Sequence, residues 1–384
     1  MQLVSPQFMN ALSYSQTPLD KVTVWRGGFP VKGAEDLTVE SGSVTISGGN
    51  GQIVKAVAEI TVIDSNGKLV PNRVEDALAP FGSELQIQMG LKIGVKPEMV
   101  NMGFFPILST EIDEQWRIVS RPDEPGIDYW VSKGARLAVE AADRTVNIDT
   151  NKFINREQPS YSTALVEAKR LLIDNQPPFG GVIGSVPDKA IPVTVTYESD
   201  RLKALLDLGE VLDADSVIDE WGSFKYQSRA ESAPVWRLEV GEFSVLKKTK
   251  RKITRDGVYN GAIEKGSGPT DAPLQAQKLI MDGALAWGGP YGKVPLQHAS
   301  SLLDTQAKVD AGVISVLARA TQVTPQNVPI ECIRNPALRW GDRIELPTRT
   351  GYITVQVTSL KFGFGVESMT LVVSADPFLL GGLL

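Results

Sequence analysis

The chain has 384 residues, and 39 lysines and arginines against 45 aspartates and glutamates give a formal net charge of −6. This length allows two or three domains that bury their cores without disulfide bonds, and the acidic balance argues against general nucleic-acid binding. One cysteine, Cys332, and one histidine, His298, exclude an internal disulfide framework and the usual transition-metal ligand sets. A carboxylate site for calcium or magnesium stays open.

The start of the chain and its apolar runs predict a protein made in the cytoplasm. Residues 1–6 lack the charged and apolar regions of a signal peptide. No run reaches the roughly 18 apolar residues that a membrane span needs. We therefore expect no membrane partner.

Up to about residue 150, strand-like segments alternate with strong turns. After a short amphipathic segment around Phe8, the first strand is expected at residues 21–25. Further strands are expected at residues 37–46, 53–63, 84–93 and 136–148. Closely spaced strands with strong turns are typical of a barrel or a sandwich. We expect residues 1–154 to form an N-terminal β-barrel-like tube domain.

The middle of the chain changes to helical periodicity. One helix is predicted where Ala164, Leu165, Ala168, Leu171 and Leu172 recur at helical spacing. A second should begin at a cap, Ser199 or Asp200, and carry Leu202, Leu205, Leu206 and Leu212 on one stripe. We expect residues 155–232 to form an inserted helical or mixed domain.

Strand-like sequence resumes at Val235 and returns at residues 328–374, with a glycine- and proline-rich stretch at 266–295 between them. A third helix is predicted near residues 305–321. We expect residues 233–384 to form a second barrel-like tube domain with a loop-rich and helical insertion at about 266–325. The predicted class is mainly β (α+β): two β-barrel tube-like domains, an inserted helical or mixed domain, and an additional helix near the C-terminal barrel.

Few residues are candidates for catalysis. Cys332 lies in a strand-like apolar segment, where packing explains a free cysteine. His298 lies beside a loop with no partner implied by the sequence, so we expect a surface or turn position. The acidic residues Asp213, Asp215 and Asp282 do not fit the calcium-loop pattern. The glycines at positions 180–181, 261 and 288–289 lack the lysine of a phosphate-binding loop. We expect no enzyme activity, no cofactor and no metal.

A basic run and an apolar tail are the candidate assembly interface. Residues 247–252 hold five cations, and a strand through them would place cations on both faces, so we expect the run to protrude. It either docks on an acidic neighbour or touches DNA, or it is a solvated hairpin that its lysines protect from edge pairing. The apolar tail, residues 376–384, either plugs a barrel end or inserts into a partner. The interface residues are Lys248, Lys250, Lys252, Phe378, Leu379, Leu380, Leu383 and Leu384.

The tryptophans, including Trp116, Trp130 and Trp340, allow two interpretations. They could line a sugar site, but their strand-like context favours buried anchors. We therefore expect these three to be buried.

Several segments in matching order resemble the minor tail proteins of actinobacterial long-tailed bacteriophages. One is the turn from Asn335-Pro336 to Gly341-Asp342, which should launch a strand. The others are residues 78–85, 103–107, 143–144, 259–261 and 290–295. Together these segments span most of the chain.

This resemblance implies a structural protein similar to the baseplate hubs of contractile-tailed phages. The implied protein is a hub in the virion tail tip that joins the tail tube to the host-recognition apparatus. Its partners would be two further copies of itself, the distal tail protein, the tape-measure protein and other minor tail proteins, with DNA passing through transiently. Two alternatives stay open: a tail-associated cell-wall hydrolase that uses two carboxylates, and a carbohydrate-binding adhesin.

Overall fold

The computed structural model describes residues 1–14, 17–49, 52–120, 128–175, 186–191, 195–230, 232–239, 244–250, 255, 258–267, 273–299, 305–320, 326–348 and 351–375. The chain divides into two compact units. The first comprises Met1–Lys250 and Pro329–Val373, and the main part of the second is Arg251–Val328. Each unit is described by itself. The predicted domain boundaries at residues 154 and 232 stay predictions.

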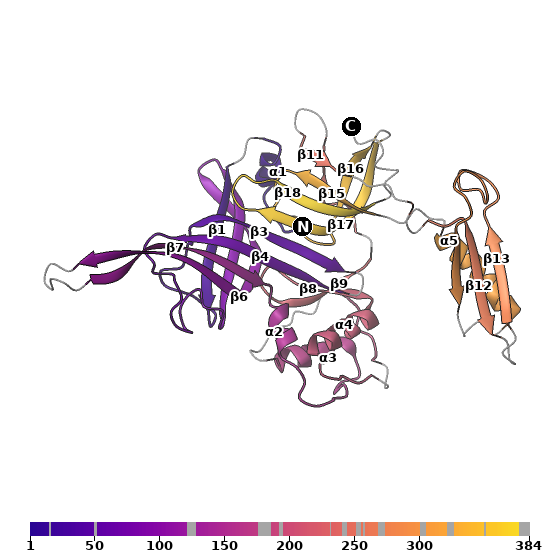
Figure 1. Cartoon of the computed structure of the whole chain (residues 1–384), viewed down its shortest axis with the longest axis horizontal. Helices are drawn as coiled ribbons and strands as arrows, with labels where there is room; N and C mark the ends of the chain where they lie inside the picture. The colour runs from indigo at the N-terminus through magenta and orange to yellow at the C-terminus, as the bar shows by residue number, and fades with distance from the viewer. Residues whose placement is uncertain are drawn as a thin grey trace. The chain divides into compact units, whose positions relative to one another are not determined.

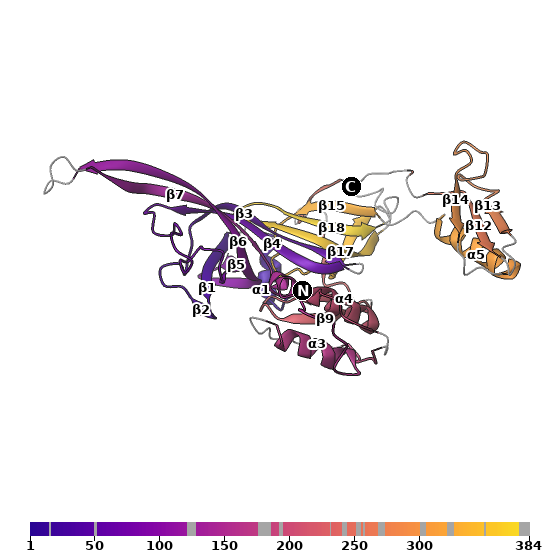
Figure 2. The same cartoon turned by 60° about the horizontal axis from the view of Figure 1, so that its bottom comes forward.

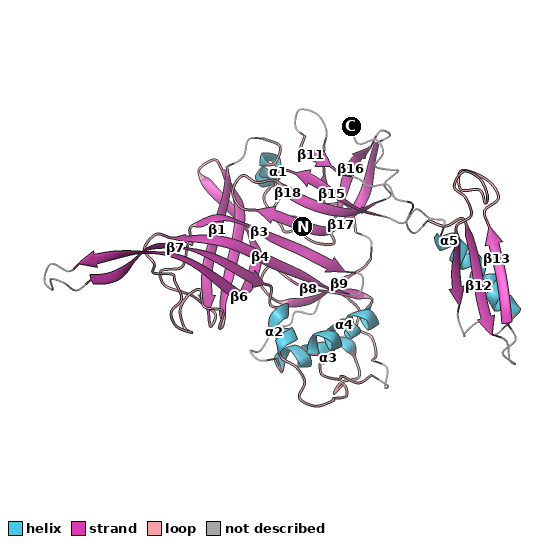
Figure 3. Cartoon of the chain, in the orientation of Figure 1, coloured by secondary structure: helices cyan, strands magenta, loops and turns pink. Residues whose placement is uncertain are grey.

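The first unit contains one large sheet (Figures 1 and 3). Its main path runs β11-β15-β18-β17-β3-β4-β7-β6-β5-β1-β2, and β8, β9, β10 and β16 are attached beside it. The strands are β1 (Pro18–Arg26), β2 (Phe29–Pro30), β3 (Val39–Gly49), β4 (Gln52–Asp64), β5 (Ser83–Ile93), β6 (Lys96–Ser120), β7 (Asp128–Ala142), β8 (Ala214–Ile218), β9 (Phe224–Ser228), β10 (Trp236–Arg237), β11 (Leu246–Thr249), β15 (Gln326–Cys332), β16 (Arg343–Thr348), β17 (Gly351–Gly363) and β18 (Met369–Ala375). With 49% strand and 14% helix, the prediction of a mainly β chain is confirmed. Closure of the sheet into barrels stays a prediction.

Alternating side chains build the core of this sheet. In β5, Leu85, Ile87 and Met89 are buried while the residues between them are half-buried. The antiparallel neighbour β1 adds Val22 and Val24, which lie opposite Ile87 and Leu85. A period of two places one apolar row on one face of a strand. The strands predicted at residues 21–25 and 84–93 are thus confirmed.

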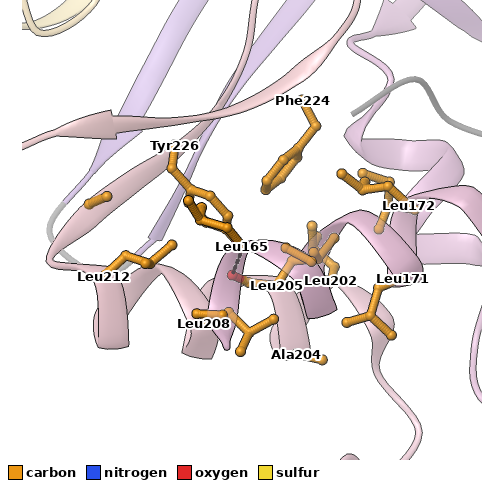
Figure 4. Packing of buried hydrophobic residues seen from close by; sticks show 14 of the residues in the cluster. Leu165, Leu171, Leu172, Leu202, Ala204, Leu205, Leu208, Leu212, Phe224 and Tyr226 are labelled. Carbon is orange, nitrogen blue, oxygen red and sulfur yellow. Dashed lines mark hydrogen bonds between the residues drawn. The ribbon is translucent and has the colours of Figure 1, made fainter. Parts of the chain in front are cut away.

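Three helices and the β8–β9 hairpin form a helical layer, in which the two predicted central helices are confirmed. The helices are α2 (Thr145–Thr150), α3 (Ala164–Ile173) and α4 (Arg201–Leu212). Asp200 begins α4, because its side chain accepts a hydrogen bond from the backbone N–H of Lys203 at 3.0 Å. The apolar stripes of α3 and α4 face Phe224 and Tyr226 of β9 (Figure 4). The Tyr226 hydroxyl donates to the Leu205 carbonyl at 2.8 Å.

The strand predicted at residues 136–148 is partly wrong, because β7 ends at Ala142 and α2 follows. Asp143 makes this break. Its carboxylate accepts hydrogen bonds from the backbone N–H and hydroxyl of Thr145 and from the N–H of Ala56. The two bonds from Thr145 are local, and they satisfy the turn and compete with continuation of the strand. The bond from Ala56 ties the turn to β4. Burial raises the pKa of Asp143, although these hydrogen bonds act to lower it.

The short amphipathic segment near the start forms helix α1 (Pro6–Ala11). The Ser5 hydroxyl accepts from the N–H of Phe8 at 3.0 Å and caps the helix. Phe8 is fully buried. This prediction is confirmed.

The second unit contains β12 (Gly261–Ser267), β13 (Pro273–Leu279), β14 (Pro295–Ala299) and α5 (Gln306–Ala320). The strands form a three-stranded sheet in the order β13-β12-β14. Ala262 of β12 and Val313 and Val316 of α5 form its small core, so the predicted third helix is confirmed. In the part of the chain that the structure describes, no helix is long and apolar enough to cross a membrane.

Candidate functional site

Lys247 and Lys248 of the basic run lie on β11, at one end of the main sheet path (Figure 1). Lys250 directly follows this strand, and Arg251 and Lys252 lie outside the described residues. β11 pairs with β15, and its ladder shifts between Leu246 and Lys248. Lys247, Lys248 and Lys250 are exposed, as the sequence predicted. Within the described ranges, none of these three ammonium groups forms an ion pair, and Lys247 donates to the Ser368 hydroxyl at 2.8 Å. Lys247 and Lys248 on the strand, and Lys250 just beyond it, therefore present positive charge at the surface, and Glu331 of β15 lies opposite Lys248.

The remaining residues of the predicted interface lie outside the described residues. These are Lys252, Phe378, Leu379, Leu380, Leu383 and Leu384. Their roles in assembly stay predictions.

A second surface is the far end of the β6–β7 hairpin, which extends beyond the other strands of the first unit (Figures 1 and 2). β5 pairs with β6 only as far as Pro106, and β4 pairs with β7 only as far as Ala135. Beyond Glu114 and Ala135, β6 and β7 pair with each other alone in the described residues. We call residues 115–120 and 128–134 the ribbon.

The ribbon carries large apolar side chains in water. Trp116, Ile118 and Trp130 are 53%, 56% and 67% exposed. Ile118 lies directly opposite Trp130, and Trp116 is two residues from Ile118, so the three share one face. The expectation that Trp116 and Trp130 are buried is therefore wrong. The physical reason is that, among the residues that the structure describes, no third strand or second layer extends along this part of the hairpin.

Trp340 is buried, as predicted, in the turn that precedes β16. Its indole N–H donates to the Gly48 carbonyl at 3.2 Å. The Asp342 carboxylate accepts from the backbone N–H of Arg339 at 2.7 Å. The Arg339 guanidinium donates to the Asn101 carbonyl, and burial lowers the pKa of Arg339 to about 10. The turn begins β16, as the sequence predicted, and ties it to β3 and β6.

A polar cleft of about 650 Å³ borders this turn and β9. It is lined by charges of both signs, among them Lys225, Glu220 and Arg229. The Arg229 guanidinium forms ion pairs with the carboxylates of Glu210 at 2.6 Å and Asp215 at 3.1 Å. Sequence reasoning missed this cleft, because its walls come from segments more than a hundred residues apart.

The two candidates for nucleophilic or acid–base chemistry belong to different units of the chain. Cys332 is fully buried on β15, and burial raises the pKa of its thiol well above the usual range, so it is a packed thiol as predicted. His298 lies on β14 with its side chain 55% exposed, which fits the predicted surface position. The structure adds a partner that the sequence did not indicate: His298 Nδ1 is 2.6 Å from the Glu264 carboxylate on β12. Among the described residues, no group of three potential metal ligands gathers.

Comparisons with known proteins identify the fold. No family model matches the chain, and no curated protein matches its sequence. Among solved structures, the tail protein from Neisseria meningitidis MC58 aligns with 95% of this chain and 99% of its own, at 11% identity and a TM-score of 0.53. The 43 kDa tail protein of prophage MuSo2 from Shewanella oneidensis aligns with 94% of this chain and 99% of its own, at 11% identity and a TM-score of 0.50.

A chain of the Francisella PdpA–VgrG complex has a similar fold. It aligns with 94% of this chain at 10% identity and a TM-score of 0.52, and the alignment spans 58% of the Francisella chain. At these identities the likeness establishes shared architecture. The chain therefore has the fold of these tail and VgrG-complex proteins over nearly its whole length.

Proposed function

We propose that this chain is a structural subunit of a bacteriophage tail. Specifically, it acts as a hub at the tail tip that joins the tail tube to the distal host-recognition apparatus. The observation that carries this proposal is the fold shared with two tail proteins over 99% of each of their lengths. Fold likeness alone does not transfer chemistry, and the proposed role is assembly, which needs surfaces and no reactive group.

The ribbon supports an assembly role. A two-stranded hairpin without a packing partner is marginally stable in water, and exposed apolar patches mark interaction sites. We assign the ribbon to contact with another copy of this chain. A contact between different surfaces of identical chains closes into a ring when the rotation permits. The proposed ring has three copies and surrounds a channel for the tape-measure protein and then DNA, with the distal tail protein and other minor tail proteins as neighbours.

The test of location is immunogold electron microscopy of virions of the source phage, with antibody raised against this chain. We expect label only at the distal end of the tail. A virion preparation without accessible tail tips is the control. Reproducible absence of the chain from particles, with mass spectrometry in agreement, contradicts the tail assignment.

One observation favours a second function, a carbohydrate-binding adhesin. Trp116 and Trp130 are exposed on the ribbon, and exposed aromatic rings can stack on sugars. An adhesin predicts saturable binding of the isolated protein to host cells, in competition with phage adsorption. The hub predicts association between copies without such binding. The hydrolase alternative predicts release of glycan or peptide from host cell walls, and an assay of the purified chain decides it.

A further inference from the structure

A pocket of about 210 Å³ lies at the end of β11. Its walls come from four regions of the first unit: β11, the chain at the start of β1, the segment after β15, and the turn between β17 and β18. The lining residues that matter here are Lys247, Arg334, Val366 and Glu367. The pocket is therefore continuous with the basic strand.

Arg334 is the unusual group in this pocket. It is only 4% exposed. Its Nη1 donates to the Gly363 carbonyl at 2.9 Å and lies 2.8 Å from Asp20 Oδ1. In contrast, Nε and Nη2 are buried and have no hydrogen-bond partner among the described residues. Buried donors without acceptors are rare and unfavourable, so these two require an explanation.

The ion pair with Asp20 does not offset the cost of removing the Arg334 charge from water. Desolvation lowers the pKa of Arg334 and raises the pKa of Asp20, in each case against the attraction between the two groups. Nε and Nη2 form one edge of the guanidinium, and such an edge binds both oxygens of a carboxylate. The free edge therefore matches an acceptor that the described residues do not supply.

The surroundings indicate what carries that acceptor. Lys247 and Lys248 on β11, and Lys250 just beyond its end, continue positive charge from the pocket for roughly 10 Å at the rise of a strand. This is longer than one small anion. The outer edge of β11 has no paired strand in the described residues, and Val366, 86% exposed, adds an apolar contact at the rim. Glu367 is the opposing charge in the pocket.

We propose that β11 and the Arg334 pocket bind an acidic, extended segment of a partner protein. One carboxylate of the segment enters the pocket and takes the Nε–Nη2 edge of Arg334, while neighbouring carboxylates lie along Lys247, Lys248 and Lys250. This inference goes beyond the proposed hub, because binding of such a segment by the isolated chain can be measured without any tail.

The experiment uses the full chain and a fluorescein-labelled decapeptide of alternating glutamate and valine, followed by fluorescence anisotropy at low and physiological salt. We expect saturable binding that weakens as salt increases. The same peptide with glutamine in place of glutamate should not bind. Inorganic phosphate and a single-stranded DNA oligonucleotide are the competitors, and neither should match the affinity of the peptide.

Four variants sharpen this test. Arg334→Lys keeps the charge and loses the two-donor edge, so binding should weaken about tenfold. Lys248→Gln with Lys250→Gln should weaken binding and reduce its salt dependence. Glu367→Gln removes the opposing charge and should tighten binding. The matched control, Lys68→Gln with Lys96→Gln, changes two exposed lysines elsewhere and should have no effect.

Thermal melting checks that each variant is folded. If Arg334→Lys does not fold, the exposed lysine pair and Glu367→Gln still decide the question. The proposal is overturned if the peptide does not bind at low salt, if folded Arg334→Lys binds as the parent does, or if phosphate or DNA binds as tightly as the peptide.

Discussion

The helical layer and the ribbon contain similar apolar side chains in opposite surroundings. In the layer, Leu171 and Leu205 are fully buried, and the helices, β8 and β9 supply their neighbours (Figure 4). In the ribbon, Trp116 and Trp130 are more than half exposed. The apolar side chains of the layer are covered by its own elements and by Ile53 of β4, whereas the ribbon presents apolar surface that the described residues leave exposed. Apolar content alone therefore does not distinguish a core from an interface.

The largest expected effect of a single substitution lies in the helical layer. Leu205→Ala removes a fully buried side chain and should lower the free energy of unfolding by about 2–5 kcal/mol, through lost burial and the cavity left behind. Denaturant unfolding of the full chain measures it. The ribbon change Ile118→Ala, at a 56% exposed position, should alter stability by less than about 0.5 kcal/mol. Similar losses of unfolding free energy for the two variants would contradict the contrast between the helical layer and the ribbon.

The second effect should appear in association rather than in stability. Trp116→Ser with Trp130→Ser should weaken contact between copies about 30-fold, the scale of about 2 kcal/mol for an aromatic hot spot. Sedimentation velocity over a concentration series measures it. Trp221→Ser is the matched control, because Trp221 is 64% exposed in the β8–β9 turn. If the parent and the double variant associate equally, the ribbon is not part of the contact between copies.

The same comparison shows which features the sequence could predict. The helical layer was predictable because Leu202, Leu205 and Leu212 lie on one stripe of α4 and Asp200 precedes it, so pattern and cap indicate the same element. β5 was predictable for the same reason, since its alternation is regular. The end of β7 was not, because the Asp143 bonds that end it include one to Ala56, far away in the chain.

The candidate sites divide in the same way. Exposure of Lys248 and Lys250 followed from alternation alone, because a strand with cations on both faces cannot be buried. Exposure of Trp116 and Trp130 did not, because it depends on where β4 and β5 stop pairing with their neighbours. The Arg334 pocket depends on Asp20 and Gly363, which are distant from Arg334 in sequence. A local sequence pattern holds no signal for such a site.

The smallest of these effects tests the local cap of the helical layer. Asp200→Ala should destabilise the chain by about 1 kcal/mol at neutral pH, because the N–H of Lys203 loses its acceptor. Burial acts to raise the pKa of Asp200, but the Lys203 hydrogen bond and the charge of Lys152 outweigh it, and the pKa of Asp200 is lowered. A lowered pKa stabilises the fold above the ordinary value of 3.8. The difference between parent and variant should therefore shrink as the pH falls through the folded-state value.

Asp200→Asn separates the hydrogen bond from the charge in this prediction. Asparagine caps helices about as well as aspartate, so this variant should keep most of the stability at neutral pH and lose only the pH dependence of the cap. Urea unfolding of the three proteins from pH 3 to pH 7 measures both quantities. If Asp200→Asn is as unstable as Asp200→Ala at pH 7, the ion pair with Lys152 at 3.4 Å, and not the cap, stabilises the start of α4. The stability of the helical layer would then depend partly on a surface ion pair. The layer would differ from the ribbon less than its buried apolar contacts imply.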